Sequence, residues 1–181
     1  MPRIVDHDAR RAELLAGAFS LFVREGYGGV TMRGLATALG VSTGTLYHYF
    51  GGKDAIFEQM VTAVSETDVA EADALVQSGR DATERVDLTF AFATLREERL
   101  RSFIHLAFDA RRHHPGGAMD DLVERAFARY RASMERQLGD VPADRRDAIF
   151  QLIVGRLVTG GLEAKPTPWD TLAAIARTLV S

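Results

Sequence analysis

Residues 31–53 read TMRGLATALGVSTGTLYHYFGGK, and this segment decides the fold prediction. Two short helical patterns lie on either side of Leu39-Gly40-Val41. The second pattern begins with small hydroxyl residues, ends in a cluster of aromatic residues and is followed by a lysine. Two short helices joined by a tight turn form a helix-turn-helix, whose second helix enters the DNA major groove. The segment therefore predicts this motif.

A helix-turn-helix needs small residues where its helices cross and short polar residues at the start of its second helix, and this segment has both. Ala36, Ala38 and Gly40 allow the two helices to cross closely. The second helix must also present short polar groups at its N-terminal end, because that end points at base edges. Four small residues stand there: Ser42, Thr43, Gly44 and Thr45. The free backbone amides of this helix end also suit a phosphate.

Larger side chains of the second helix divide between the core and the DNA. Leu46 and Phe50 are four residues apart, so they share the face that anchors the helix. Tyr47 and His48 then lie toward the DNA, with the phenol suited to a phosphate oxygen and the imidazole to a phosphate or a base. Lys53 is expected over the sugar-phosphate backbone. Singly, such residues are usually helix caps or core residues, but their ordered combination indicates DNA binding.

Helical periodicity dominates the chain, and no run of two-residue alternation indicates a strand. We therefore predict an all-α fold of about nine helices. Gly26 is expected to end the first helix, and the hydroxyls of Thr31, Ser42 and Thr167 to cap the second, third and last helices. A linker at residues 113–117 separates the sixth helix from the seventh. The expected helices are, roughly, 8–25, 31–40, 42–49, 53–77, 81–95, 97–112, 119–138, 143–162 and 167–181.

Composition bounds the class of protein. The chain has 181 residues, of which 46% are hydrophobic and 26% charged, so a sizeable core is available. It has no cysteine, which excludes disulfides and thiolate zinc sites. The N-terminus carries charges where a signal peptide needs an apolar run, and no stretch reaches the roughly 18 apolar residues of a membrane span. We therefore expect a soluble, cytoplasmic protein with no membrane partner.

The distribution of charge is more informative than the net charge of −3. Residues 1–53 hold 6 lysines and arginines against 4 acidic residues, whereas the remainder holds 16 basic and 21 acidic residues. Phosphate repels an acidic body, which leaves the N-terminal segment as the favoured face toward DNA.

The motif lies within a longer pattern. Residues 19–57, FSLFVREGYGGVTMRGLATALGVSTGTLYHYFGGKDAIF, resemble the DNA-binding domain of the tetracycline-repressor (TetR) family of transcriptional regulators. The matching features are Gly-Tyr after the first helix, Thr at the start of the second, Leu-Ala, Leu-Gly-Val, Gly-Thr-Leu-Tyr, and an aromatic pair before Lys. The resemblance implies a DNA-binding domain at residues 1–53 and a ligand-binding and dimerisation domain at residues 54–181.

The resemblance also implies a mode of action. A protein of this family is a homodimer that binds a palindromic operator, most often as a repressor, and leaves it when a small molecule enters the larger domain. No cofactor is implied. By family position, the residues that read bases are Thr43, Gly44, Thr45 and His48. Those that hold phosphates are Thr31, Arg33, Tyr47 and Lys53, with Ser42 on the same edge as a helix cap.

Two places depart from the family pattern. Gly34 stands where an acidic or larger residue is common, and it loses about 1 kcal/mol of helix propensity relative to alanine. Gly51 and Gly52 precede Lys53 where a proline, serine or asparagine is common, which predicts a looser entry to the fourth helix. Both departures concern the phosphate contacts.

The C-terminal helices are too apolar to be buried wholly within one subunit. Residues 149–158 are hydrophobic on most of the helix circumference, and the last helix carries a second apolar stripe. Two such helices from each subunit predict a four-helix dimer interface, which the family resemblance also implies. The alternative is packing within one chain alone. The residues predicted for the interface are Phe150, Ile153, Val154, Leu157, Trp169, Leu172 and Ala176.

Residues of the middle helices and one arginine are candidates for a ligand cavity. Those predicted to line it are Phe103, His105, Phe108, Phe127, Tyr130, Met134 and Arg156. The alternative is that the apolar members simply fill the core. Arg156 interrupts an apolar run, and a buried guanidinium needs an anionic partner. That partner is either a carboxylate across the subunit interface or an acidic ligand.

Metal binding is the less favoured of the roles predicted for the histidines. His105, Asp109 and His113 are spaced four apart on one helix face. However, His113 and His114 precede a proline-glycine break, where histidines are more often solvated or cap a helix end. We therefore predict no metal.

Two other functions are compatible with a helical chain. An all-helical enzyme has no support in the sequence, which contains no glycine-rich phosphate loop, no nucleophile elbow and no helical His-Glu metal pair. An adaptor that binds protein through the hairpin needs apolar area at the start of its second helix, where this chain has Ser-Thr-Gly-Thr. A ligand-responsive, non-enzymatic regulator that binds double-stranded DNA is therefore the favoured function.

Overall fold

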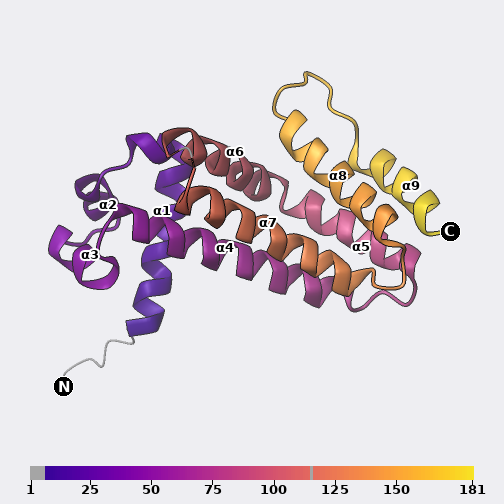
Figure 1. The fold of residues 1–181 in the computed structure, drawn as a ribbon, viewed down its shortest axis with the longest axis horizontal. Coiled ribbons are helices and arrows are strands. Elements are labelled where there is room, and N and C mark those ends of the chain that lie inside the picture. The colour runs from indigo at the N-terminus through magenta and orange to yellow at the C-terminus, as the bar shows by residue number, and fades with distance from the viewer. Residues whose placement is uncertain (1–6, 115) are drawn as a thin grey trace. The chain divides into compact units, whose positions relative to one another are not determined.

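The computed structural model describes residues 7–114 and 116–181, so Pro115 of the predicted linker lies outside the described residues. Within these ranges the chain forms nine α-helices and no strand, which confirms the all-α prediction (Figure 1). They are α1 (His7–Gly29), α2 (Met32–Ala38), α3 (Thr43–Phe50), α4 (Lys53–Val76), α5 (Ala82–Leu95), α6 (Glu97–His113), α7 (Ala118–Gln137), α8 (Ala143–Thr159) and α9 (Trp169–Val180).

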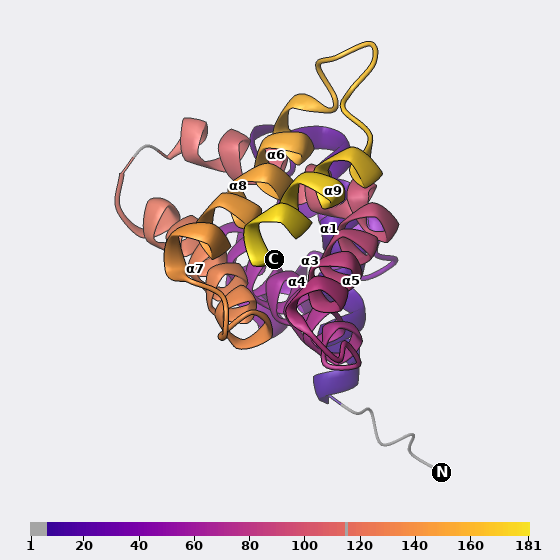
Figure 2. The same ribbon diagram turned by 90° about the vertical axis from the view of Figure 1, so that its right-hand side faces the viewer.

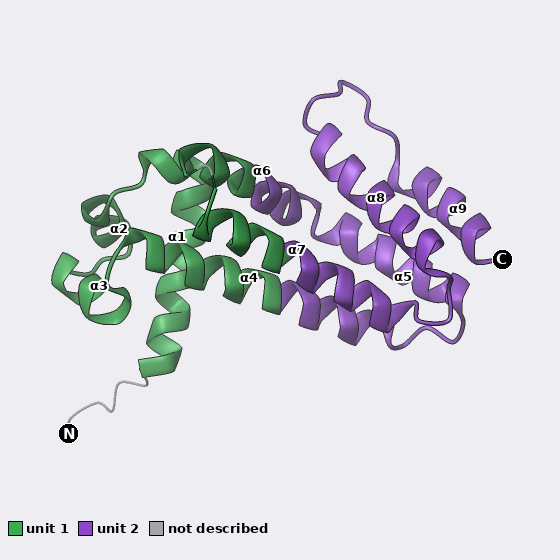
Figure 3. Cartoon of the chain, in the orientation of Figure 1, with its two compact units in different colours: residues 1–66, 106–126 green, residues 67–105, 127–181 purple. Residues whose placement is uncertain are grey.

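The helices belong to two compact units (Figure 3). Unit 1 comprises residues 1–66 and 106–126, and unit 2 comprises residues 67–105 and 127–181. Helices α4, α6 and α7 therefore contribute residues to both units. The domain boundary predicted after residue 53 falls at the first residue of α4, whereas the compact units are divided elsewhere in the sequence.

Local signals set the ends of the first three helices. Gly26 has φ 71°, so the backbone leaves the helical conformation there, as predicted. The Thr31 hydroxyl accepts a hydrogen bond from the Gly34 amide, and the Ser42 hydroxyl accepts one from the Thr45 amide. Both side chains are therefore N-caps, which confirms the predicted roles.

An aromatic cluster forms the centre of the unit 1 core. The ring centroids of Phe22 and Phe57 lie 5.2 Å apart, and those of Tyr27 and Phe57 lie 4.9 Å apart. Both pairs are edge-to-face, an arrangement that aromatic rings favour. All three side chains are at most 1% exposed, and with Leu35 and Leu46 they fix the helices of this unit through buried apolar area.

Unit 2 is a helical bundle in which α5 packs on α9 and α8 packs on α9 (Figure 2). Its core is continuous and mainly aliphatic. The fully buried members include Val86, Leu138, Ile149 and Ala176.

The start of α9 differs from the prediction. Thr167 makes no side-chain cap, because Pro168 takes the N-cap position and forms no capping hydrogen bond. The Thr167 carbonyl instead accepts a hydrogen bond from Nε of Arg156 at 2.8 Å. A guanidinium from α8 therefore holds the segment that the hydroxyl was expected to order.

Among the residues that the structure describes, no helix is both long enough and apolar enough to cross a bilayer.

Candidate functional site

The second helix of the predicted motif, α3, is anchored through one face and presents the other to solvent. Leu46 is fully buried and Phe50 is 6% exposed, so both side chains anchor the helix in the core of unit 1. Thr43, Tyr47 and His48 are exposed, and Tyr47 keeps 54% of its surface in contact with solvent. A helix held in this way offers short polar and aromatic side chains to a partner.

The cap of α3 also orders its exposed end. The hydroxyls of Ser42 and Thr45 lie 2.9 Å apart, and the Thr45 amide donates to the Ser42 hydroxyl at 3.0 Å. Gly44 is exposed between them. Ser42, Gly44 and Thr45 therefore form a small polar end to the helix, beside the exposed side chain of Thr43.

The predicted phosphate contacts on α2 are exposed as well. Thr31 caps the helix through its hydroxyl, at 3.0 Å from the Gly34 amide, and remains on the surface. Arg33 is exposed, and its carbonyl accepts a hydrogen bond from the Thr37 hydroxyl. The Arg33 side chain therefore lies on the surface in the first turn of α2.

Lys53 makes contacts that the sequence did not predict. Its ammonium donates to the Tyr27 carbonyl at 3.1 Å and lies 4.3 Å from the centre of the Tyr27 ring. The Tyr27 hydroxyl donates to a carboxylate oxygen of Asp54 at 2.5 Å. Burial and this acidic neighbour raise the pKa of Tyr27. The buried tyrosine therefore holds both Lys53 and Asp54 in the first turn of α4.

The C-terminal turns of α6 contact the same tyrosine within unit 1. The Tyr27 amide donates to a carboxylate oxygen of Asp109 at 2.7 Å. The His114 ring meets the Tyr27 ring edge-on, with centroids 5.3 Å apart. Nδ1 of His113 lies 2.9 Å from the Asp109 carbonyl. These contacts give the histidines packing roles, and the described residues contain no cluster of three or more His, Cys, Asp or Glu side chains suited to a metal.

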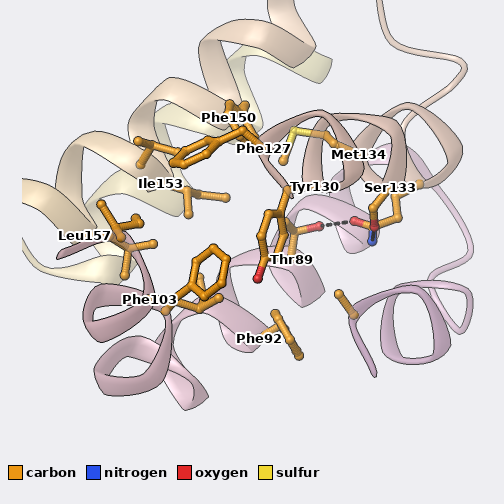
Figure 4. Close-up of a pocket in the computed structure, with 16 residues that line it drawn as sticks. Thr89, Phe92, Phe103, Phe127, Tyr130, Ser133, Met134, Phe150, Ile153 and Leu157 are labelled. Atoms are coloured by element: carbon orange, nitrogen blue, oxygen red, sulfur yellow. Dashed lines mark hydrogen bonds between the residues drawn. The ribbon is translucent and has the colours of Figure 1, made fainter. Parts of the chain in front are cut away.

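A cavity of about 690 Å³, its open mouth included, lies within unit 2 (Figure 4). Four of the residues predicted for a ligand cavity line it: Phe103, Phe127, Tyr130 and Met134. The remaining lining residues are Ala72, Thr89, Phe92, Ala93, Leu100, Ile104, Ser133, Gln137, Phe150, Ile153, Val154 and Leu157. The spacing of Ser133 and Gln137, two polar residues four apart on the apolar stripe of α7, is the one sequence signal that marks the polar part of this wall.

Three predicted cavity residues lie elsewhere. His105 is exposed, and Phe108 belongs to unit 1 and is 48% exposed. Arg156 is not among the lining residues, because its guanidinium pairs with Glu97 at 2.9 Å and stacks on the Trp169 ring at 5.1 Å. Its anionic partner is thus a carboxylate of the same chain, which neither predicted alternative included.

Glu97 connects these groups. Its carboxylate accepts a hydrogen bond from the Trp169 indole at 2.8 Å and pairs with Arg156. The bond from Trp169, together with the charge of Arg156, holds the pKa of Glu97 below its usual range although burial opposes this. The cluster therefore joins the start of α6, the last turn of α8 and the start of α9 by charge-assisted bonds.

The residues predicted for a subunit interface are mostly buried within the single chain. Six of the seven are at most 9% exposed within the single chain, and four of the seven line the cavity. A side chain that is already buried has little surface left to offer a second copy, so which residues of α8 and α9 would meet a second copy stays a prediction. The six buried residues are Phe150, Ile153, Leu157, Trp169, Leu172 and Ala176, and the half-buried Val154 also lines the cavity.

Comparisons with known proteins agree with the N-terminal motif. Residues 14–60 match the family of bacterial regulatory proteins described as the tetR family. The HTH-type transcriptional repressor AcnR of Corynebacterium jeikeium (strain K411) is 28% identical over 148 residues, which cover 80% of this chain and 76% of that protein.

Solved structures share the fold over nearly the whole chain. The reduced form of NemR from E. coli has a TM-score of 0.79 at 17% identity, covering 94% of this chain and 96% of that one. The transcriptional regulator FadR from Bacillus subtilis, in complex with stearoyl-CoA, has a TM-score of 0.75 at 17% identity, covering 94% and 97%. Together, the exposed helix-turn-helix, the match over residues 14–60 and the shared fold make this chain similar to the DNA-binding transcriptional regulators of the tetR family.

Proposed function

We propose that the protein is a repressor that binds a palindromic operator as a homodimer and leaves it when a small molecule occupies the cavity of unit 2. The observation that carries the proposal is the face of α3, where Thr43, Tyr47 and His48 are exposed while Leu46 is fully buried beneath them. The relative AcnR is named as a transcriptional repressor, which supports the sign of regulation.

Base reading is assigned to the start and middle of α3. Thr43, Gly44, Thr45 and His48 belong to one short helix whose N-terminal end is polar and exposed or half-buried. An α-helix that enters the major groove by this end brings such side chains against base edges. The phosphate contacts are assigned to Thr31, Arg33, Tyr47 and Lys53, with Ser42 as the cap.

Dimerisation is assigned to the outward faces of α8 and α9. On α8, Gly155 and Thr159 are exposed, and Leu152 and Val158 are half-buried. On α9, Ala174 and Thr178 are exposed and small, and Ile175 keeps 46% of its surface in solvent. Small residues allow close helix contact, and an exposed apolar residue gains most from being covered. A two-fold axis through this face would pair both helices with their copies.

Effector control is assigned to the cavity in unit 2. Its wall is mainly apolar with a few polar side chains, the composition that is usual for small-molecule sites. FadR, which has the same fold, holds stearoyl-CoA in its crystal structure. Occupation of the cavity would release DNA only if the occupied form fits the operator less well than the empty form.

The test is binding of the purified protein to the DNA upstream of its own gene, followed by gel shift or fluorescence anisotropy over a salt series. We expect saturable binding that weakens steeply with salt, with a log–log slope of about −0.9 for each phosphate contact. Equal binding to a scrambled duplex of the same composition would contradict a sequence-specific regulator. No binding at low salt would contradict the DNA interface itself.

A further inference from the structure

The wall of the unit 2 cavity is almost wholly apolar. Its largest apolar side chains are four phenylalanines and a methionine: Phe92, Phe103, Phe127, Phe150 and Met134. Figure 4 shows these side chains around the cavity, with Tyr130 among them and Ser133 toward one end. None of the described residues that line the cavity is an arginine, a lysine or a histidine.

The side-chain donors of the polar wall residues are already engaged in hydrogen bonds within the protein. The Ser133 hydroxyl donates to Asp73 at 2.5 Å. The Gln137 amide donates to Asp73 and to the Ser133 oxygen, both at 2.8 Å. The Thr89 hydroxyl donates to the Arg85 carbonyl at 2.8 Å. An acceptor on a ligand therefore finds no free side-chain donor at this end.

The tyrosine of the wall is committed in the same way. The Tyr130 hydroxyl donates to a carboxylate oxygen of Asp68 at 2.8 Å. Asp68 is fully buried and pairs with Nε of Arg99 at 2.8 Å. Burial is the main reason that the pKa of Asp68 is raised, with Arg99 and Tyr130 opposing it. The ionisable group that contacts this part of the wall is therefore a carboxylate, and its partner Arg99 is not among the lining residues.

This arrangement is unfavourable for an anion. A buried carboxylate, phosphate or sulfonate needs a cation or several donors to replace its hydration, and the lining supplies neither. Acceptors are available, because the Gln137 carbonyl meets the Thr89 hydroxyl only at 3.5 Å. A neutral hydroxyl or amide N–H of a ligand can therefore be satisfied where an anionic group cannot.

We propose that this cavity takes an uncharged, largely apolar small molecule and excludes anionic groups from its interior. The inference rests on the proposed function for its regulatory meaning, whereas the selection itself is a property of the cavity. An anionic molecule is excluded even where its apolar part would fit the cavity, because the free-energy cost of removing the charged group from water remains.

Two matched probes test the selection on the full chain. N-phenyl-1-naphthylamine is uncharged, and 8-anilino-1-naphthalenesulfonate has nearly the same aromatic framework with a sulfonate added. We expect the uncharged probe to bind with a rise in its fluorescence and with quenching of Trp169, the one tryptophan of the sequence. The sulfonate should bind more weakly by about tenfold or more, because its charge has no partner in the wall. Equal affinity for the two probes overturns the proposal.

A variant pair on α4 assigns the binding to this cavity. Ala72→Leu adds volume at a lining position, whereas Ala74→Leu makes the same change two residues away on the exposed face of the helix. We expect loss of probe binding in the first variant alone. If Ala72→Leu lowers the melting temperature of the protein, Val154→Phe replaces it as the test variant, because Val154 lines the cavity from α8. Unchanged binding in a folded filled variant overturns the assignment.

A second pair of ligands separates a neutral molecule from one that leaves its charged end outside. 1-Decanol and decanoate have the same chain, so each is titrated against the bound uncharged probe. Displacement by decanol at a concentration about tenfold lower supports the proposal, and equal displacement overturns it.

DNA binding is measured on the same samples. If the protein prefers the uncharged probe but does not bind DNA, the proposed function is refuted and the proposed ligand class is retained. If it binds DNA but does not prefer the uncharged probe, the proposed ligand class is refuted and the proposed function is retained.

Discussion

The Lys53 ammonium lies 4.3 Å from the centre of the Tyr27 ring and donates a hydrogen bond to the Tyr27 carbonyl at 3.1 Å. A cation above an aromatic face is held electrostatically, so the side chain is ordered before any DNA arrives. An ammonium has three donors, and the Tyr27 carbonyl uses one of them. The remaining donors suit a phosphate, and the residue would lose little side-chain entropy in binding it.

Replacing Lys53 by alanine is expected to weaken binding to operator and non-operator DNA alike, by about tenfold at moderate salt, because one phosphate contact is lost. The salt slope should fall by about one contact. The measurement is anisotropy over a salt series. Lys165→Ala, which removes the other lysine from an exposed loop, is the matched control and should leave both quantities unchanged. A loss confined to the operator would contradict the phosphate assignment.

Thr43→Ala and His48→Ala are expected to change which operator is preferred, with a discrimination loss of about 1–3 kcal/mol at the affected base pair. The measurement is a panel of duplexes with single base-pair changes. Thr83→Ala on the exposed side of α5 is the control for loss of a surface hydroxyl. A uniform loss across the panel would reassign both side chains to the phosphates.

Neighbouring residues of α3 should separate stability from binding. Leu46 is fully buried, so Leu46→Ala should lower the free energy of unfolding by about 2–5 kcal/mol. Tyr47 is 54% exposed, so Tyr47→Phe should change stability by less than about 0.5 kcal/mol while weakening DNA binding through the lost hydroxyl. Urea titrations and anisotropy measure the two effects. A Tyr47→Phe variant with unaltered affinity would remove the tyrosine hydroxyl from the interface.

Ile175→Glu is expected to separate the proposed dimer without unfolding the chain, because this side chain is 46% exposed in the single chain. Sedimentation velocity should then show a monomer, and operator affinity should fall because each copy holds only one half-site. Val23→Glu places the same charge at another exposed apolar residue, on α1, and should leave the dimer intact. A dimeric Ile175→Glu variant would move the interface to another face.

The Glu97 cluster predicts a pH dependence of stability. Because the pKa of Glu97 is lowered in the folded chain, the unfolded chain takes up the proton first as the pH falls. The stabilisation is therefore complete well above about pH 4.3, the ordinary pKa of glutamate, and is lost as the pH falls through the lower folded value.

Glu97→Gln should cost about 1–3 kcal/mol at pH 7, and its difference from the native chain should shrink below about pH 4.3. Urea unfolding followed by Trp169 emission measures this, because the indole donates to Glu97. The exposed Glu163→Gln is the control. A constant difference across this pH range would show that the charge of Glu97 does not stabilise the fold.

Short-range signals determined most of the helix-turn-helix. Gly26 breaks the helical backbone within α1, and Thr31 and Ser42 cap the next two helices. Each of these roles depends on backbone groups within a few residues of the side chain, so a single sequence suffices to predict them. The four-residue spacing of Leu46 and Phe50 likewise fixed which face of α3 is buried, because a short helix with one apolar stripe has one way to pack.

Tertiary structure alone decided the faces and partners of unit 2. The segment from Ile149 to Val158 is apolar on most sides, so its periodicity does not say which side meets α9 and which meets solvent. For the same reason, the sequence pattern did not identify Glu97 as the partner of Arg156 or Asp73 as the acceptor for Ser133. These pairs join residues far apart in the chain, and only the packing of the helices brings their charges and hydroxyls within bonding distance.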